Sequence, residues 1–268
     1  MSDFLQTMAA SSAQRAAAAE QIVSADLDKP LVPLTLDGFD VIAEIKERSP
    51  AEGELATDEI SRTSRAQLYS KGGAAAISVL TEPSKFSGSL DHLEEVVAAV
   101  PETPVMRKDF LVEPVQILEA RRSGASGVLL IITMLTDAKL RAMLDCAAEQ
   151  EMFVLLESFS SDDLARTARL LDNESDQERV QRGQWLIGVN TRDLRTLHVD
   201  PDRLASLAPE LPTGHRVAES GLHDADDAAR VAGLGYQLAL VGTALMRSND
   251  PAALITAMRA AGSARVAA

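Results

Sequence analysis

Charged side chains stand at the end of a short apolar run near residue 45, where they could act on a small molecule. The run at 41–46 reads VIAEIK and carries Glu44 and Lys46, two residues apart. Side chains two apart on a strand lie on the same face, about 7 Å apart along the strand. A carboxylate and an ammonium group held together in this way can serve acid–base catalysis or bind a charged substrate.

The same order, apolar residues first and a polar residue last, recurs in four further runs. PVMRK ends in Lys108, FVLLE in Glu157, LIGVN in Asn190 and RVAE in Glu219, and Arg192 follows Asn190 at the same parity. A single strand-end charge usually closes an ion pair or caps a helix. Five strands that end alike indicate a common site built from strand ends, as at the mouth of a (β/α)8 barrel.

A phosphate-binding site is indicated by the loops after the last two apolar runs. Gly221 and Gly242 permit close approach of the backbone, and Ser220 and Thr243 offer hydroxyl groups. In many such barrels the loops after strands 7 and 8 bind phosphate through backbone N–H groups and a helix N-terminus. Taken alone, a Ser-Gly or Gly-Thr pair is more typical of a turn, and it is the location after both strand ends that makes a phosphate site an equal alternative.

The overall charge excludes some partners. The chain of 268 residues carries a net charge of -14, which argues against nucleic acid or an anionic membrane surface, because those partners require concentrated Lys and Arg. A small anionic substrate needs only a local group of cations. Lys46, Arg107, Lys108 and Arg192 are candidates. Arg107 is the weakest of them, because its parity is opposite to that of Lys108 and could turn it toward the helix layer.

Other classes of site and location are disfavoured. The single cysteine, Cys146, cannot form an internal disulfide and is expected to be a small buried hydrophobe. Four histidines are scattered without the spacing of metal ligands, so we expect no metal. The longest apolar runs, such as 127–135, are shorter than the roughly 20 residues of a membrane span. We expect a cytoplasmic monomer.

The elements that must position these side chains are eight apolar strands alternating with amphipathic helices. The expected strands are 41–46, 75–80, 104–108, 127–132, 153–157, 186–190, 215–219 and 238–242, and clear helical periodicity covers 90–100, 137–150, 161–171 and 224–235. This alternation implies parallel pairing, in an open doubly wound sheet or a closed barrel. Eight units in about 200 residues favour the (β/α)8 barrel.

We therefore expect one domain over 1–268, with the barrel at 41–268. Residues 1–40 are expected to form an N-terminal helical extension that could cover one end of the barrel. The polar segment 172–184 is interpreted as a solvated insertion on the N-terminal face of the barrel, away from the chemistry.

Seven motifs in order resemble the indole-3-glycerol phosphate synthase family over residues 41–247. They are VIAEIKERSP, ISVLTEPSKFSGS, PVMRKDFLVEPVQILEAR, VLLI, IGVNTRDL, VAESGL and LVGTALMR. The resemblance implies a (β/α)8 barrel with an N-terminal helical extension and no metal or organic cofactor. The implied reaction, in tryptophan biosynthesis, closes the ring of 1-(2-carboxyphenylamino)-1-deoxyribulose 5-phosphate, giving indole-3-glycerol phosphate, carbon dioxide and water.

The resemblance also implies roles for individual residues. Lys108 is similar to the family's general acid, which protonates the substrate carbonyl as the carbon–carbon bond forms, and Glu157 to the carboxylate that serves the later dehydration. The remaining matches are the first-strand pair Glu44 and Lys46; the polar shell Asn190, Arg192 and Glu219; the phosphate site Ser49, Ser220, Gly221, Gly242 and Thr243; and the apolar wall Phe86, Phe110 and Leu130.

The protonation of Lys108 depends on opposing influences. Burial and the neighbouring Lys46 would lower the pKa of Lys108, whereas Glu44 and Glu157 would raise it. The sequence leaves this balance open.

Two other readings stay open. The first is another phosphate-handling barrel, although a metal-dependent epimerase would need inward His and Asp ligands and a phosphoribosylanthranilate isomerase a Cys near the end of its first strand. The second is a non-catalytic barrel that binds a phosphorylated ligand as a sensor or scaffold.

Overall fold

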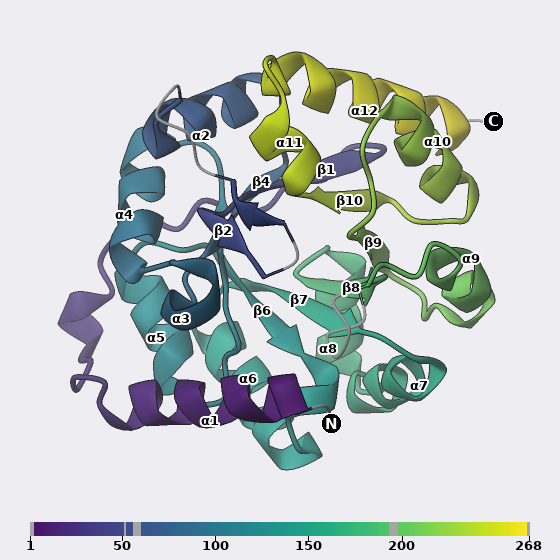
Figure 1. The fold of residues 1–268 in the computed structure, drawn as a ribbon. Coiled ribbons are helices and arrows are strands. Elements are labelled where there is room, and N and C mark those ends of the chain that lie inside the picture. The colour runs from purple at the N-terminus through teal and green to yellow at the C-terminus, as the bar shows by residue number, and fades with distance from the viewer. Residues whose placement is uncertain (1–2, 51, 56–59, 193–197, 267–268) are drawn as a thin grey trace.

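The chain forms a closed barrel of parallel strands surrounded by helices in a computed structural model, which describes residues 3–50, 52–55, 60–192 and 198–266 (Figure 1). Around the barrel the strands follow the order β1-β10-β9-β8-β7-β6-β5-β4. Their bounds are β1 Asp40–Ile45, β4 Ala76–Leu80, β5 Val105–Lys108, β6 Gly127–Ile131, β7 Phe153–Ser158, β8 Trp185–Asn190, β9 His215–Glu219 and β10 Leu238–Val241. The eight strands and the (β/α)8 architecture expected from the sequence are confirmed.

Alternate residues of each strand belong to two separate apolar clusters. In β1, Val41, Ala43 and Ile45 pack in the cluster shared with the helices, whereas Ile42 belongs to the cluster inside the barrel. Both faces of each strand are therefore buried, which explains why the strands read as continuous apolar runs. The same alternation directs Glu44 inward.

The helices between the strands form the outer layer, as Figure 1 shows. Their bounds are α2 Arg62–Lys71, α4 Leu90–Ala99, α5 Val115–Arg122, α6 Asp137–Glu149, α7 Ser161–Leu170, α9 Arg203–Leu207, α10 Ala225–Gly233 and α12 Pro251–Val266. Ser89, Thr136, Ser160 and Asp224 cap α4, α6, α7 and α10 by accepting a backbone N–H three residues on. The four helices expected from periodicity are confirmed, to within two residues at each end.

Short elements gather at the carboxyl ends of the strands. They are β2 Arg48–Ser49, β3 Gly53–Glu54, α3 Pro83–Phe86, η2 Ile132–Met134 and α11 Thr243–Arg247, while η1 Ser24–Asp26 and η3 Ala208–Glu210 lie elsewhere. β2 and β3 pair as an antiparallel hairpin after β1. These elements surround the mouth of the barrel.

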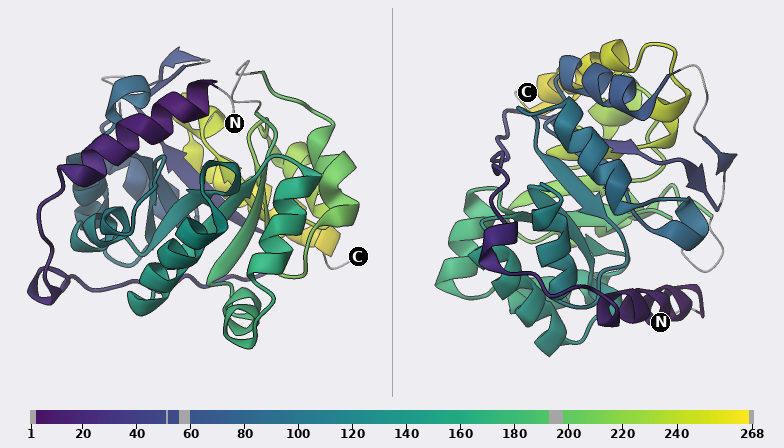
Figure 2. Two further views of the ribbon diagram at one scale, coloured as in Figure 1. Left: turned by 90° about the horizontal axis from the view of Figure 1, so that it is seen from below. Right: turned by 90° about the vertical axis from the view of Figure 1, so that its left-hand side faces the viewer.

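The N-terminal extension contacts both ends of the barrel. Helix α1, Asp3–Ala17, lies along one side of the mouth, and the chain then runs along the outside to the opposite end (Figure 2). Arg15 donates two hydrogen bonds of 2.8 Å to Asp109 at the end of β5. Leu34 and Leu36 join the barrel-interior cluster, and Leu36 lies beside Gly183, which precedes β8. The helical extension expected over residues 1–40 is confirmed as a helix for residues 3–17.

The polar segment at 172–184 is more than a solvated insertion, so that interpretation was wrong in part. It contains helix α8, Glu174–Gln181, capped by Asn173. Asp176 on this helix is 4% exposed and accepts a hydrogen bond of 3.0 Å from Trp185 Nε1. Periodicity did not reveal this helix because only two of its residues are buried. Figure 2 places it at the end of the barrel away from α1.

Candidate active site

A cavity of about 460 Å³ opens at the carboxyl ends of the strands. Its walls combine strand-end residues with the hairpin after β1, the loops after β8, β9 and β10, and the first turn of α1. The cavity lies where (β/α)8 enzymes carry their active sites.

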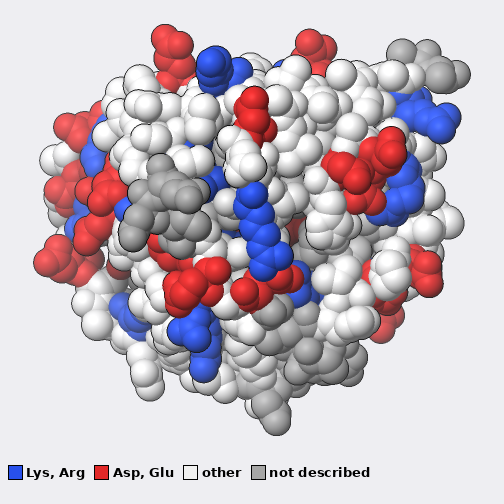
Figure 3. All heavy atoms as spheres, turned by 45° about the horizontal axis from the view of Figure 1, so that its top comes forward, with Lys and Arg blue, Asp and Glu red and all other residues white. Residues whose placement is uncertain are grey.

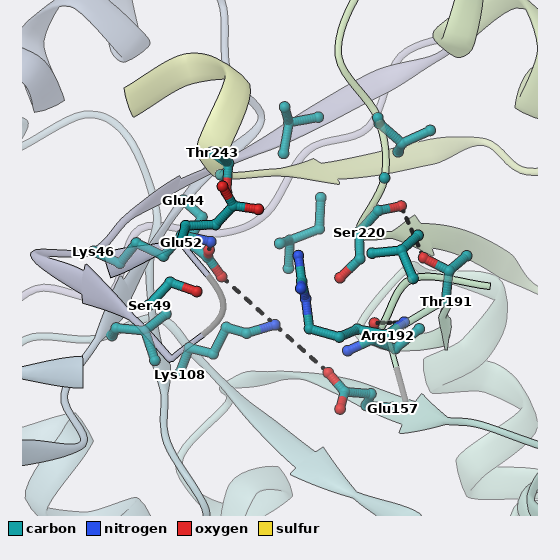
Figure 4. A pocket seen from close by; sticks show the side chains of 18 of the residues that line it. Glu44, Lys46, Ser49, Glu52, Lys108, Glu157, Thr191, Arg192, Ser220 and Thr243 are labelled. Atoms are coloured by element: carbon teal, nitrogen blue, oxygen red, sulfur yellow. Dashed lines mark hydrogen bonds and ion pairs between the residues drawn. The ribbon is translucent and has the colours of Figure 1, made fainter. Parts of the chain in front are cut away.

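Lys108 lies at the centre of the charged groups in this cavity. Its Nζ is 3.2 Å from Glu219 Oε2, 3.5 Å from Glu157 Oε2 and 3.7 Å from Glu44 Oε2. Figure 4 shows the Lys108 side chain extending between Glu44 and Glu157. Four residues from four different strands therefore converge, as the repeated strand-end pattern predicted.

Glu44 and Lys46 form a second ion pair in the same cavity. Lys46 Nζ is 2.6 Å from Glu44 Oε1, and both side chains line the cavity wall. Gly242 makes room for them, because a β-carbon at that position would lie 2.3 Å from Glu44 Oε1 and 2.8 Å from Lys46 Nζ. The glycine expected to approach phosphate thus also has a packing reason to lack a side chain.

The pKa values of these groups are shifted in different directions. Burial lowers the pKa of Lys108, but Glu219, Glu157 and Glu44 outweigh burial and raise it above its usual value. Burial raises the pKa of Glu44, but Lys46 and Lys108 outweigh burial and lower it. The pKa of Glu219 is raised well above normal, chiefly by burial and also by Glu157, against the opposing effect of Lys108. The balance left open for Lys108 is thus decided by its carboxylates.

The loops after β9 and β10, which are neighbouring strands, lie side by side in the cavity wall. Ser220 and Gly221 both have left-handed backbone, with φ values of 67° and 69°, a conformation that costs energy for Ser220 and is typical of functional loops. The hydroxyl of Thr191 lies 3.1 Å from the carbonyl oxygen of Ser220 and 3.2 Å from that of Glu219. Figure 4 shows Thr243 and Ser220 on the opposite side of Lys108 from Glu157.

The apolar side of the cavity is built around aromatic rings. Phe110 packs against Phe86 at 6.1 Å between ring centroids and against Phe4 of α1 at 5.8 Å. Leu129 and Ile131 of β6 complete this wall. The arrangement could accept a flat aromatic group.

Leu130 was wrongly assigned to this wall. It is fully buried in the cluster shared with the helices, whereas its neighbours Leu129 and Ile131 line the cavity. The physical reason is strand parity, because adjacent side chains point to opposite faces. Leu129 and Ile131 share the inward parity of β6, so alternation along the strand predicts these two residues, and not Leu130, for the wall.

Two arginines near the strand ends have different surroundings. Arg192 lines the cavity, and its backbone N–H donates to Asn190 Oδ1 at 2.9 Å. Arg107, the weakest of the four candidate cations, does not line the cavity: it points toward the helices, as its opposite parity indicated, and donates to the carbonyl of Gln116 at 2.8 Å. Arg107 is therefore a structural residue.

Several cavity residues were not found from the sequence. Phe4 comes from the extension, whose position relative to the barrel no local pattern reveals. Glu52 and Arg247 line the rim and form an ion pair of 2.9 Å between the β2–β3 hairpin and α11. Thr191 directly follows Asn190, so its position just after a strand end could have predicted it as a cavity residue.

Within the described ranges, no group of three or more His, Cys, Asp or Glu side chains is placed to hold a metal ion. The donor set of the cavity is instead suited to organic anions, with ammonium groups, hydroxyls and backbone N–H groups.

Comparison with known proteins identifies close relatives in sequence. A family model described as "Indole-3-glycerol phosphate synthase" matches residues 31–258. Curated proteins of that name include one from a Nocardioides species, 43% identical over 239 residues, covering 87% of this chain and 86% of the relative. Another, from Mycobacterium leprae, is 43% identical over 247 residues, covering 91% of this chain and 85% of the relative.

Solved structures share the fold at low sequence identity. The chain matches 3-hexulose-6-phosphate synthase from Salmonella typhimurium with a TM-score of 0.60 at 13% identity, covering 84% of this chain and 99% of the other. Thiamine phosphate pyrophosphorylase from Pyrococcus furiosus matches with a TM-score of 0.59, also at 13% identity, covering 85% and 97%. These matches show the barrel fold.

Proposed function

The chain belongs to the indole-3-glycerol phosphate synthase family, and from this premise we propose how its residues carry out the reaction. The activity is the closure of 1-(2-carboxyphenylamino)-1-deoxyribulose 5-phosphate to indole-3-glycerol phosphate, with release of carbon dioxide and water, in tryptophan biosynthesis. Family membership decides against the isomerase, epimerase and sensor readings.

The substrate lies with its aromatic ring against Phe110 and Phe86 and its phosphate at the loops after β9 and β10. The cavity supports this orientation because its apolar wall and its glycine-containing loops flank the same charged centre. Left-handed backbone at Ser220 and Gly221 allows close approach of the chain to the phosphate. Ser49 and Thr243 add hydroxyl groups, and Gly242 precedes the first turn of α11.

Lys108 is the general acid for ring closure. As the ring carbon that carries the carboxylate attacks the ketone carbon, the ketone oxygen gains negative charge, and Lys108 donates a proton to it. The three carboxylates around Lys108 raise its pKa, so its amine is protonated before the reaction begins. Loss of carbon dioxide then leaves the bonding electrons in the ring system.

Dehydration completes the indole. The new hydroxyl leaves as water after protonation, and a proton is removed from the neighbouring carbon. Glu157 is the carboxylate that serves this step, and Glu44 with Lys46 provides a second acid–base pair on the facing strand. Asn190 and Arg192 line the cavity and hold the polar groups of the substrate. Glu219 holds the catalytic lysine by accepting its hydrogen bond.

The observation that carries this proposal is the position of Lys108, within 3.2–3.7 Å of three carboxylates in a cavity with an apolar wall. An isolated lysine would not combine burial with a retained proton.

The test is a product assay with the purified chain after dialysis against EDTA. We expect indole fluorescence to appear when the anilino-deoxyribulose phosphate is added, and to be lost in Lys108→Met. A well-folded protein that binds the substrate without forming product would contradict the proposed roles. Activity that requires added metal would contradict cofactor-free catalysis.

We further propose a cytoplasmic enzyme that works as a monomer on its small anionic substrate, without a nucleic-acid or membrane partner. Among the described helices, none is both long and apolar enough to cross a bilayer. On the face that Figure 3 shows, basic side chains stand among acidic ones instead of forming a continuous basic patch.

A further inference from the structure

Glu219 occupies an unusual position beneath the charged centre of the cavity. Its side chain is fully buried, and the described cavity-lining residues include Glu44, Lys108 and Glu157 but not Glu219. Its Oε2 accepts a hydrogen bond of 3.2 Å from Lys108. The carboxylate thus supports Lys108 from below.

The space that this carboxylate fills belongs to Gly188 of β8. Gly188 has the inward parity of Leu186, which packs inside the barrel, and of Asn190, which lines the cavity. A β-carbon on Gly188 would lie 2.3 Å from Glu219 Oε1, closer than real atoms approach, and 2.9 Å from Leu155 Cδ1. Any larger residue must displace the carboxylate.

Strand register explains why the displacement would matter. Gly188 pairs with Glu157 on one side, while Glu219 pairs with Asn190, two residues further along β8. The Glu219 side chain therefore leans down over Gly188, to the level of Glu157. This position brings Glu219 to Lys108 together with Glu157.

We propose that Gly188 is a positioning residue for catalysis, because its missing side chain is the space in which the Glu219 carboxylate holds Lys108. This inference rests on the proposed roles of Glu219 and Lys108. The backbone of Gly188 lies outside the left-handed region, so an alanine there is opposed by close contacts, the shortest with Glu219 Oε1 and the next with Leu155 Cδ1, and not by φ.

The experiment compares Gly188→Ala with the wild-type enzyme in steady-state kinetics and pH profiles. We expect kcat to fall by roughly 10- to 100-fold, since a displacement of about 1 Å costs this much at a catalytic group. Moving Glu219 away removes one of three carboxylates that raise the pKa of Lys108. The basic limb of kcat/KM should therefore move to lower pH.

Two control substitutions separate this effect from general crowding. Gly127→Ala places a β-carbon 2.5 Å from the Phe153 ring, away from the charged centre, whereas a β-carbon at Gly233 meets nothing within 4 Å. Gly127→Ala should lower stability with an unchanged pH profile, and Gly233→Ala should retain wild-type kinetics. A shifted basic limb in Gly127→Ala would overturn the proposal, because crowding alone would then suffice.

A double-mutant cycle tests whether Gly188 acts through Glu219. In a Glu219→Gln background, adding Gly188→Ala should not shift the basic limb further. If Glu219→Gln is impaired while Gly188→Ala behaves like wild type, the inference fails and the role of Glu219 stands. If Glu219→Gln itself behaves like wild type, the proposed role of Glu219 fails, and the inference with it.

A further pair of variants covers the case in which Gly188→Ala does not fold. Glu219→Asp retracts the carboxylate by one methylene and should restore folding to the Gly188→Ala variant. An unfolded double variant would show that the contact with Leu155 Cδ1, and not the Glu219 carboxylate, decides whether a side chain fits at position 188, contrary to the proposal.

Discussion

Individual residues in the cavity balance opposing charges. Lys108 and Lys46 face Glu44, Glu157 and Glu219, so two cations meet three carboxylates in a largely buried space. This arrangement favours the protonated form of Lys108. It also lowers the stability of the folded protein when Glu219 is ionised, because burial and Glu157 raise the pKa of Glu219. Chemistry and stability therefore make different demands on the same side chains.

Replacing the proposed acid and the proposed dehydration carboxylate should affect turnover more than binding. We expect Lys108→Ala and Glu157→Gln to lower kcat by about 10²- to 10⁴-fold with KM changed only a few-fold, because each acts on charge that develops in the transition state. Steady-state kinetics of both variants check this. A loss confined to KM would identify them as binding groups.

Glu219→Gln should stabilise the folded protein at neutral pH while impairing catalysis. The folded state binds the Glu219 proton more tightly than the unfolded chain, whose pKa is near 4.5. The stability linked to this proton is present below that pH and is lost as pH rises through the folded-state pKa. A neutral glutamine avoids the loss.

We expect the melting temperature of Glu219→Gln to exceed that of wild type by roughly 2–4 °C at pH 7, or about 1 kcal/mol. The difference should vanish near pH 4, where Glu219 is protonated in both states. Thermal unfolding across this pH range measures it. A melting temperature lower than wild type at pH 7 would contradict the prediction.

At the level of elements, helix α1 is held to the barrel by Arg15 and Asp109 and contributes Phe4 to the cavity. Asp109 is buried and accepts hydrogen bonds from Thr81 and from its own following residue as well. The extension is thus attached to the strand that carries Lys108.

Arg15→Met should loosen α1 and weaken substrate binding. We expect KM to rise several-fold with a smaller change in kcat, because Phe4 contacts Phe110 in the aromatic wall and takes no part in proton transfer. Arg122→Met is the control, since it removes an exposed ion pair with Glu20 and should leave both constants unchanged. Unchanged KM in Arg15→Met would show that α1 stays in place without its arginine.

Helix α8 bears on stability at the opposite end of the barrel. Asp176→Ala removes the partner of Arg141 and of the buried Trp185 Nε1. We expect a loss of about 2 kcal/mol in urea unfolding with kcat unchanged. Glu178→Ala, on the exposed side of α8, should change neither. A fall in kcat at unchanged stability would contradict the placement of α8 away from the chemistry.

At the level of the whole molecule, little apolar surface is exposed on the described residues. Among the described residues, Val23 is the only large hydrophobic side chain that is strongly exposed, so these residues offer no broad apolar surface for an obligate dimer. The net charge of -14 also opposes self-association.

Sedimentation equilibrium should therefore give the mass of a single chain over a wide range of protein concentration. The same experiment at raised salt tests whether charge repulsion alone keeps the chains apart. A stable dimer at both salt concentrations would contradict the monomer prediction.

The sequence by itself determined the strand–helix alternation, the barrel and the strand-end residues Glu44, Lys108 and Glu157, because parity and strand direction are local properties. Family motifs added Phe86 and Phe110, which line the cavity. The motif-based assignment of Leu130 was wrong because adjacent side chains of β6 point to opposite faces, which places Leu130 among the helices.

Only the tertiary structure decided the features that depend on contacts between distant segments. Phe4 joins Phe110 across more than 100 residues, the three carboxylates set the protonation of Lys108, and Gly188 leaves the space for Glu219. None of these is readable along the chain, since each arises where separate strands and helices meet. The barrel converts side chains that are far apart in the sequence into neighbours separated by 3–4 Å.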